Sequence, residues 1–340
     1  MWLTSSSVGR KFIMAVSGCA LVLFVTFHCV MNSVAILWPT AYNMVCEFLG
    51  ANWYALVGTA GLALLIAIHI IYACWLTVQN RRARGKDRYL ITSRPKSVEW
   101  SSKNMLVLGF VVIAFMGLHL YQFWAKMQLP EVCGMATEYP AAAGTLFLAD
   151  TFGNIWVSCV YVVAFIALWL HLTHGFWSMF QSIGWDSTRW IPRWKCIGCW
   201  WTSIVCLLFV AQVAVFTYNA STDYYKTNPE LKAQYAEMIG GTINENFNTA
   251  YTTTDLDVLL DEINADLNDK IDEQSNLNLA NVQEEEHLFF EKLFEARAQI
   301  LNITACNDKV DEETQESVEE ATPANEVAIT APDTNENQDI

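Results

Sequence analysis

The sequence predicts an all-α membrane protein, a bundle of five membrane-spanning helices followed by a polar, partly helical carboxyl-terminal extension. Two observations carry this prediction. Five continuous apolar stretches are each long enough to cross a bilayer core, which takes about 20 apolar residues as helix. The charge is also divided: residues 1–221 contain 14 Lys and Arg against 7 Asp and Glu, whereas residues 222–340 contain 6 against 28. The two regions therefore suit different solvents.

The predicted spans are uninterrupted apolar runs at residues 12–37, 55–79, 104–127, 154–182 and 197–219. In lipid, only helices and closed barrels satisfy their own backbone hydrogen bonds. Barrel strands are short segments of alternating polarity, so continuous runs favour helices. The first run is too long for a signal peptide and lacks a small-residue cleavage signature, so we expect it to remain as a span.

The basic residues predict the orientation, because Lys and Arg near helix ends stay on the cytoplasmic side. Apart from Lys126, the basic residues before position 222 flank the spans on one side: Arg10, Lys11, Arg81, Arg82, Arg84, Lys86, Arg88, Arg94, Lys96, Lys103, Arg189, Arg193 and Lys195. The connections on the other side hold Glu47, Glu131, Glu138 and Asp150. We therefore expect the amino terminus inside and, after five spans, the extension outside.

Five of the six histidines fall in predicted spans. His28, His69, His119 and His171 lie one on each of the first four spans, and His174 follows on the fourth. An ionisable group inside a membrane is costly and by default indicates a functional site. A neutral imidazole can instead bond a carbonyl of a neighbouring helix. Because a histidine recurs on four successive helices, ligation is the favoured interpretation.

The depths of these histidines predict two pairs. Counted at about 1.5 Å per residue, His28 and His119 lie about 25 Å from the cytoplasmic ends of their helices, and His69 and His171 lie about 18 to 23 Å from theirs. Two pairs at two levels suit two six-coordinate haems b, since neutral imidazole is a normal haem ligand. A zinc or mononuclear iron site would draw three or four ligands, often with a carboxylate, to one level. No carboxylate lies within a predicted span.

Four local motifs surround these histidines: F-H-C-V-M-N at 27–32, H-I-I-Y-A-C-W at 69–75, G-L-H-L at 117–120 and H-L-T-H-G-F-W-S at 171–178. Through them, residues 5–220 resemble the dihaem cytochrome b anchor of bacterial succinate:quinone oxidoreductases, the succinate dehydrogenase and fumarate reductase family. The last motif is the most specific. The resemblance implies one haem ligand on each of the first four helices, with His69 and His171 on the inner haem and His28 and His119 on the outer haem. His174 is then a candidate for contact with the ligand or a propionate.

The same resemblance implies the partners and the location. A family anchor binds a flavoprotein subunit and an iron-sulfur subunit on its cytoplasmic face and passes electrons to membrane quinone, here expected to be menaquinone. The expected location is the bacterial cytoplasmic membrane, and the resemblance allows a homodimer of complexes. We expect no nucleic-acid partner and no dicarboxylate chemistry in this chain, so whether it acts as an enzyme depends on a quinone site.

Quinone turnover needs an apolar slot and a group that exchanges protons with solvent. Glu47, beside Tyr42 and Asn43 in an outer connection, is the acid/base candidate, although a solvated glutamate is the simpler interpretation. Some relatives carry a glutamate on the fourth helix that is thought to help protons cross. Here Trp169 and its neighbours are uncharged.

The extension is predicted in two parts, residues 222–305 and residues 306–340. Apolar residues recur at helical spacing in two stretches, which predicts two amphipathic helices: Leu256, Leu259, Leu260, Ile263, Leu267 and Ile271, then Leu288, Phe289, Leu293, Phe294 and Ile300. The acidic, polar remainder is expected to be disordered. Cys196 and Cys199 have the spacing of a metal or redox pair, but no second pair or nearby histidine completes it.

Two alternative functions stay open. One is the anchor of a different dihaem cytochrome b complex, such as a hydrogenase or formate dehydrogenase, against which the motif at 171–178 argues. The other is a transporter whose histidines relay protons without haem. A transporter would favour broken helices and internal repeats, whereas the predicted spans have no interior proline.

Overall fold

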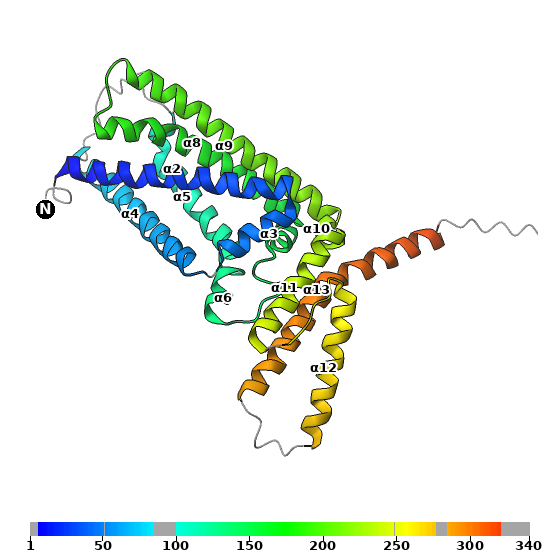
Figure 1. The fold of residues 1–340 in the computed structure, drawn as a ribbon. Helices are drawn as coiled ribbons and strands as arrows, with labels where there is room; N and C mark the ends of the chain where they lie inside the picture. The colour runs from blue at the N-terminus through cyan, green and yellow to red at the C-terminus, as the bar shows by residue number, and fades with distance from the viewer. Residues whose placement is uncertain (1–5, 51, 85–99, 248, 277–283, 321–340) are drawn as a thin grey trace, which may run out of the picture.

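The computed structural model describes residues 6–50, 52–84, 100–247, 249–276 and 284–320, among which there is no strand. Five helical segments are long and apolar enough to cross a membrane (Figure 1). They are α2 (Ser7–Leu37), α4 (Trp53–Arg84), α5 (Trp100–His119) with the π-helix η1 (Leu120–Trp124), α8 (Ile155–Ile183) and α9 (Trp190–Ser221). The prediction of an all-helical, multi-pass membrane protein is confirmed. Most of the predicted basic connection, with Lys86, Arg88, Arg94 and Lys96, lies outside the described residues.

Local sequence sets where the long helices begin and end. The Ser6 hydroxyl accepts a hydrogen bond from the Gly9 N–H at 2.9 Å and caps α2. The Asn154 side chain likewise accepts from the Trp156 N–H at 3.0 Å and caps α8. Such caps satisfy amides that have no partner within the helix. Helix α8 ends at Gly184, whose φ of +98° is a left-handed conformation that favours glycine.

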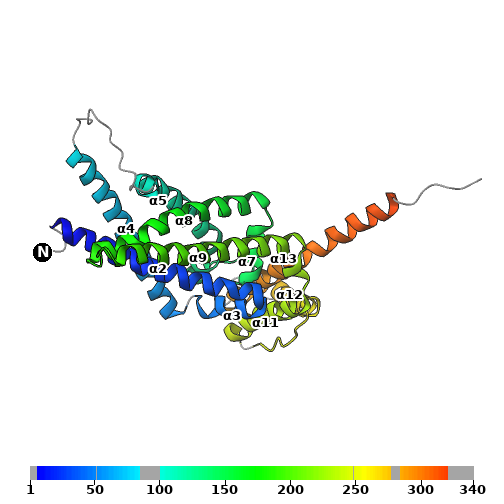
Figure 2. The same ribbon diagram turned by 90° about the horizontal axis from the view of Figure 1, so that it is seen from above.

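Four of the spans form a ring. Helix α2 packs against α4 and α8, and α5 packs against α8 and, over fewer positions, α4. Helix α9 covers α8 and α2, and Figure 2 shows α8 between α5 and α9. In the described part of the chain, α2 and α5 do not pack along their lengths, and neither do α4 and α8. Each of these two pairs is therefore diagonal in the ring.

The end of the bundle opposite the amino terminus contains three short helices that we predicted as connections (Figure 1). They are α3 (Pro39–Phe48), α6 (Gln128–Cys133) and α7 (Gly144–Phe152). Pro39 occupies the first turn of α3, where a backbone N–H would have no hydrogen-bond partner within the helix, so proline costs no hydrogen bond there. Helix α7 is core: Leu146, Phe147 and Leu148 are at most 2% exposed.

The extension folds onto the same end of the bundle as four helices. They are α10 (Tyr224–Thr227), α11 (Pro229–Phe247), α12 (Leu256–Asn276) and α13 (Glu284–Glu320). The two predicted amphipathic helices are present as α12 and α13, which pack on each other. Most of the predicted apolar positions are core, with Leu259, Ile263, Leu293 and Ile300 fully buried. Leu288 and Phe294 of α13 are instead 47% and 52% exposed, which corrects their predicted place on the buried face. The placement of the Ile271 side chain lies outside the described residues. One apolar cluster runs from the bundle through α7 and α9 into α11, α12 and α13.

The predicted boundary at residue 306 lies within α13, which continues to Glu320. The acidic segment has few large apolar groups, which is why composition predicted disorder. Glu and Lys are nonetheless good helix formers, and a helix nucleated upstream propagates at little cost. Residues 321–340 lie outside the described residues.

Candidate functional site

The outer pair of histidines comes from two diagonal helices. His28 lies on α2, and His119 is the last residue of α5. Their ring centroids are 5.7 Å apart and their planes are nearly perpendicular, at 85°. Both side chains are half-buried. The depth argument placed these residues at one level, and the structure brings their rings together.

Aromatic and polar groups surround His119. Phe115 and Phe123 lie on either side of it in sequence, with ring centroids 5.9 and 5.2 Å from that of His119. The Nδ1 atom of His119 is 3.2 Å from the Tyr161 hydroxyl of α8. That hydroxyl donates to Oε1 of Gln122 at 2.7 Å. Gln122 belongs to η1, which begins directly after His119; π-helical turns of this kind are frequent at functional sites.

The inner pair comes from the other diagonal, His69 on α4 and His171 on α8. The two side chains lie within electrostatic range of each other. Nδ1 of His69 is 3.1 Å from the Ser17 hydroxyl of α2. Nδ1 of His171 is buried and has no hydrogen-bond partner. An unsatisfied buried polar atom is uncommon in folded proteins.

Glycines of two neighbouring helices lie beside the rings of His69 and His171. A Cβ atom on Gly18 of α2 would lie 3.5 Å from Cε1 of His69. A Cβ atom on Gly109 of α5 would lie 3.9 Å from Cε1 of His171. Either methyl would therefore sit in van der Waals contact with an imidazole. The two glycines keep these positions beside the rings free of side-chain atoms.

These residues fit a bis-histidine haem site. Two metal–nitrogen bonds of about 2 Å, together with the two rings, separate imidazole centroids by roughly 6 Å. The 5.7 Å between His28 and His119 is close to that value. Among the described residues, no three His, Cys, Asp or Glu side chains gather to hold a metal ion. A haem iron takes only two protein ligands, and a diagonal histidine pair could supply both.

His174 lies one turn beyond His171 on α8, toward the end of the bundle where the described chain begins. Its ring meets that of Trp177 edge-on, with centroids 4.9 Å apart. The ammonium of Lys195 lies 4.2 Å from the centroid of the same indole. His174 thus belongs to a cationic and aromatic rim, and its contact with a haem stays a prediction.

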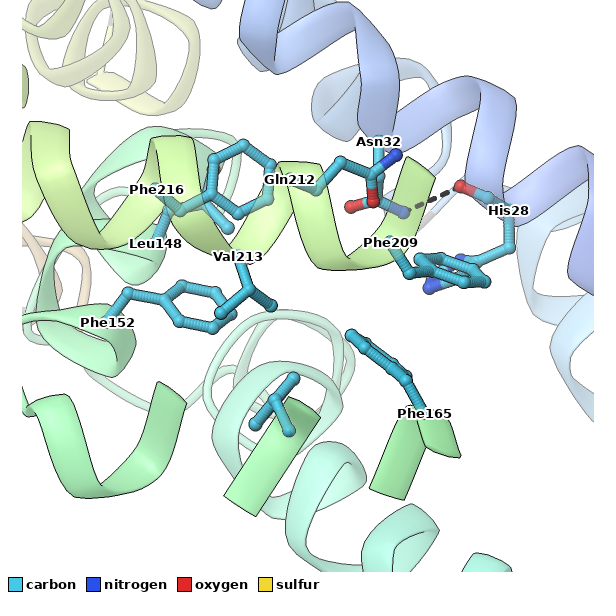
Figure 3. A pocket seen from close by; sticks show the side chains of 10 residues that line it. His28, Asn32, Leu148, Phe152, Phe165, Phe209, Gln212, Val213 and Phe216 are labelled. Atoms are coloured by element: carbon cyan, nitrogen blue, oxygen red, sulfur yellow. Dashed lines mark hydrogen bonds between the residues drawn. The ribbon is translucent and has the colours of Figure 1, made fainter. Parts of the chain in front are cut away.

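A small cavity lies beside His28, between α2, α7, α8 and α9 (Figure 3). Its volume is about 40 Å³, whereas pockets for small molecules enclose roughly 300 to 1,000 Å³. The amides of Asn32 and Gln212 line it among aromatic rings. Asn32 Nδ2 donates to the His28 carbonyl at 2.8 Å, and Gln212 Nε2 donates to the Cys29 carbonyl at 2.8 Å. The Gln212 bond therefore ties α9 to α2, the helix that carries His28, whereas the Asn32 bond lies within α2.

The structure does not bring Glu47 to this cavity. Glu47 lies in the last turn of α3 with an exposed side chain, and its backbone carbonyl accepts a hydrogen bond from Asn52 at 3.2 Å. Of its predicted companions, Asn43 is fully buried and Tyr42 is 8% exposed. Tyr42 donates to Asn32 Oδ1 at 3.3 Å, which links α3 to the edge of the cavity.

Sequence reasoning missed Ser17, Asn32, Gln122, Tyr161 and Gln212. All five are polar residues inside predicted or observed spans, and intramembrane polarity was the signal that could have found them. No family model, curated protein or solved structure matches this chain.

Proposed function

We propose that this chain is the dihaem cytochrome b anchor of a succinate:quinone oxidoreductase, which relays electrons between a cytoplasmic iron-sulfur subunit and membrane quinone. Two histidine pairs on opposite diagonals of one helix ring carry this proposal. In each pair, two helices that do not pack on each other would supply the two axial groups of a flat ligand held between them. The aromatic rings around the outer pair suit an apolar macrocycle.

In this proposal, His28 and His119 hold the outer haem and His69 and His171 hold the inner haem. The haems supply one-electron redox chemistry between the two faces of the membrane. The described spans contain no carboxylate that would bring negative charge close to the haems. Phe24 stacks on His28 and Phe115 on His119, with centroids 5.5 and 5.9 Å apart, which restricts the rotation of both rings.

The inner rim supports a role in binding haem propionates and the partner subunits. The Arg10 guanidinium lies 4.6 Å from the Trp75 ring centroid, and that of Arg193 lies 5.1 Å from Trp190. With Lys195 over Trp177, three cations are held on aromatic rings near one end of the bundle. Anionic propionates or an acidic partner surface would meet fixed positive charge there.

Haem content tests the proposal directly. We expect the purified chain, expressed with ample porphyrin, to show a reduced-minus-oxidised spectrum of cytochrome b and two haems per polypeptide. His69→Ala or His171→Ala should remove the inner haem, whereas His287→Ala, on the extension, is a control that should retain both. A colourless wild-type polypeptide, or an unchanged spectrum in His171→Ala, would overturn the proposal and favour a proton-relay transporter.

Purification of the native complex tests the family. Co-purification of a flavoprotein and an iron-sulfur protein, with succinate-dependent reduction of menaquinone, would support the anchor of a succinate:quinone oxidoreductase. Two haems in a complex with hydrogenase or formate dehydrogenase activity would instead assign the chain to a different dihaem cytochrome b complex.

A further inference from the structure

One histidine of each pair bonds a buried hydroxyl on another helix. In the inner pair, His69 Nδ1 meets Ser17 Oγ at 3.1 Å. In the outer pair, His119 Nδ1 meets Tyr161 Oη at 3.2 Å. Ser17 and Tyr161 are 2% and 3% exposed, so water does not compete for either hydroxyl. Both bonds use Nδ1 and leave Nε2 available to a ligand.

Each hydroxyl has a second partner that accepts its single proton. Ser17 donates to the Met14 carbonyl at 3.0 Å, and Tyr161 donates to Gln122 Oε1 at 2.7 Å. A hydroxyl offers one donor and two acceptor lone pairs, and a carbonyl oxygen only accepts. All groups are satisfied when each hydroxyl oxygen accepts a hydrogen bond from the imidazole Nδ1–H. The lone pair of that neutral tautomer lies on Nε2, where it can bind a metal.

The other histidine of each pair has no such bond. Nδ1 of His171 is buried without a partner, and no side chain in the described ranges hydrogen-bonds to the ring of His28. Each pair therefore combines one imidazole whose tautomer and ring plane are fixed by a hydroxyl with one that is held by packing alone. Both pairs thus contain one hydrogen-bonded histidine and one without such a bond, although the hydroxyl comes from a serine in one pair and a tyrosine in the other. A shared function would explain this recurrence.

We propose that Ser17, and Tyr161 together with Gln122, are positioning residues that fix one axial ligand in each haem site and thereby set the midpoint potential of that haem. The inference rests on the proposed haem ligation. A hydrogen bond accepted from Nδ1–H makes the ligand more basic. A more basic ligand stabilises ferric over ferrous iron, so loss of the acceptor raises the midpoint potential.

A spectroscopic redox titration of the full-length chain tests the inference. The wild type should titrate in two steps, one for each haem. Ser17→Ala should move one step to higher potential and leave the other in place, and Tyr161→Phe should move the step that Ser17→Ala leaves in place. Ser17→Thr keeps a hydroxyl and should return the potential toward the wild-type value. Thr26→Val is the matched control, because its hydroxyl bonds the Val22 carbonyl on the same helix at 2.8 Å.

A second variant keeps the inference testable if Tyr161→Phe does not fold. Tyr161 contacts Phe115, Phe152 and Phe165, and if Tyr161→Phe fails to accumulate, Gln122→Leu removes the hydroxyl's acceptor and leaves this aromatic contact intact. It should move the same single step in the same direction. Variants that keep both haems at wild-type potentials, or that move both steps together, would overturn the inference while leaving haem ligation in place. A wild type without haem would overturn both proposals.

Discussion

The Asn43 side-chain oxygen of α3 accepts two hydrogen bonds from Thr145 of α7, one from its backbone N–H at 3.0 Å and one from its hydroxyl at 2.8 Å. Both residues are fully buried. The extension completes this contact: Asn43 Nδ2 donates to Gln234 Oε1 at 2.9 Å, and the Thr145 hydroxyl lies 2.8 Å from that of Tyr235. Both partners belong to α11, so the network fastens the extension to the bundle.

Replacing Asn43 should therefore destabilise the end of the bundle that carries the extension. Asn43→Ala leaves the buried Thr145 N–H and Gln234 amide without their partner, and each such loss costs about 1 to 3 kcal/mol. We expect a loss of about 2 to 4 kcal/mol, measured as a lower midpoint of thermal denaturation in detergent. Asn52→Ala is the control, because Asn52 is exposed and bonds only carbonyls of α3. Equal midpoints for the two variants would contradict the proposed fastening role.

A glycine sets the distance between α3 and α7. A Cβ atom on Gly144 would lie 2.3 Å from the sulfur of Cys46 and 2.9 Å from Cε1 of Tyr42. Gly144→Ala should force the two helices apart and cost about 1 to 3 kcal/mol, the usual range for overpacking. Gly58→Ala, where a Cβ meets nothing within 4 Å, should be neutral or stabilising because alanine favours helix. Thermal denaturation of both variants in the same detergent measures the difference.

The same contact predicts an unreactive cysteine. Burial raises the pKa of the Cys46 thiol from 9.0 to about 12. Since the thiolate is the nucleophile, Cys46 should react with iodoacetamide at pH 8 far more slowly than Cys133, which is exposed on α6. The neutral thiol also contributes stability that is complete below pH 9 and is lost as the pH rises toward 12. Mass spectrometry of both peptides over time gives the two rates, and similar rates would refute burial of Cys46.

The spans and the approach of His28 to His119 could be predicted because both depend on position along the chain. Apolar runs give the helices, and the rise per residue gives the depth of each histidine. The contacts of His119 could not be predicted this way. Gln122 follows it within a π-helical turn, where the residue spacing of an α-helix no longer holds. Ser17 was missed for another reason, since its contact with His69 joins two helices whose relative rotation the sequence does not specify.

The sequence signal for one helix of the extension was overlooked, and for α7 of the bundle the sequence gives no signal. Leu231, Tyr235, Ile239 and Ile243 recur every four residues and are buried in α11, so helical periodicity was present there. Helix α7 has no such signal, because seven of its nine residues are buried among the bundle and the extension. Its ends follow from packing that a single sequence does not reveal.

Glu47→Gln should slow quinone-linked turnover and leave both haems in place. The exposed carboxylate can exchange protons with solvent, but it does not line the cavity beside His28. A role in proton delivery would therefore reduce the turnover number with little effect on haem content. Steady-state assays with a menaquinone analogue measure this, with Glu138→Gln as a control at the same end of the bundle. Unchanged turnover in Glu47→Gln would remove Glu47 from the mechanism.

Cys133 offers a test of the predicted orientation. It is exposed on α6, at the end of the bundle that carries the extension and opposite the amino terminus (Figure 1). If the basic residues mark the cytoplasmic side, a membrane-impermeant maleimide should label Cys133 in intact cells whose outer barrier is permeable. Ser102→Cys supplies a matched site at the start of α5, exposed at the other end of the bundle. That cysteine should react only after the cytoplasmic membrane is opened, and the reverse pattern would invert the proposed topology.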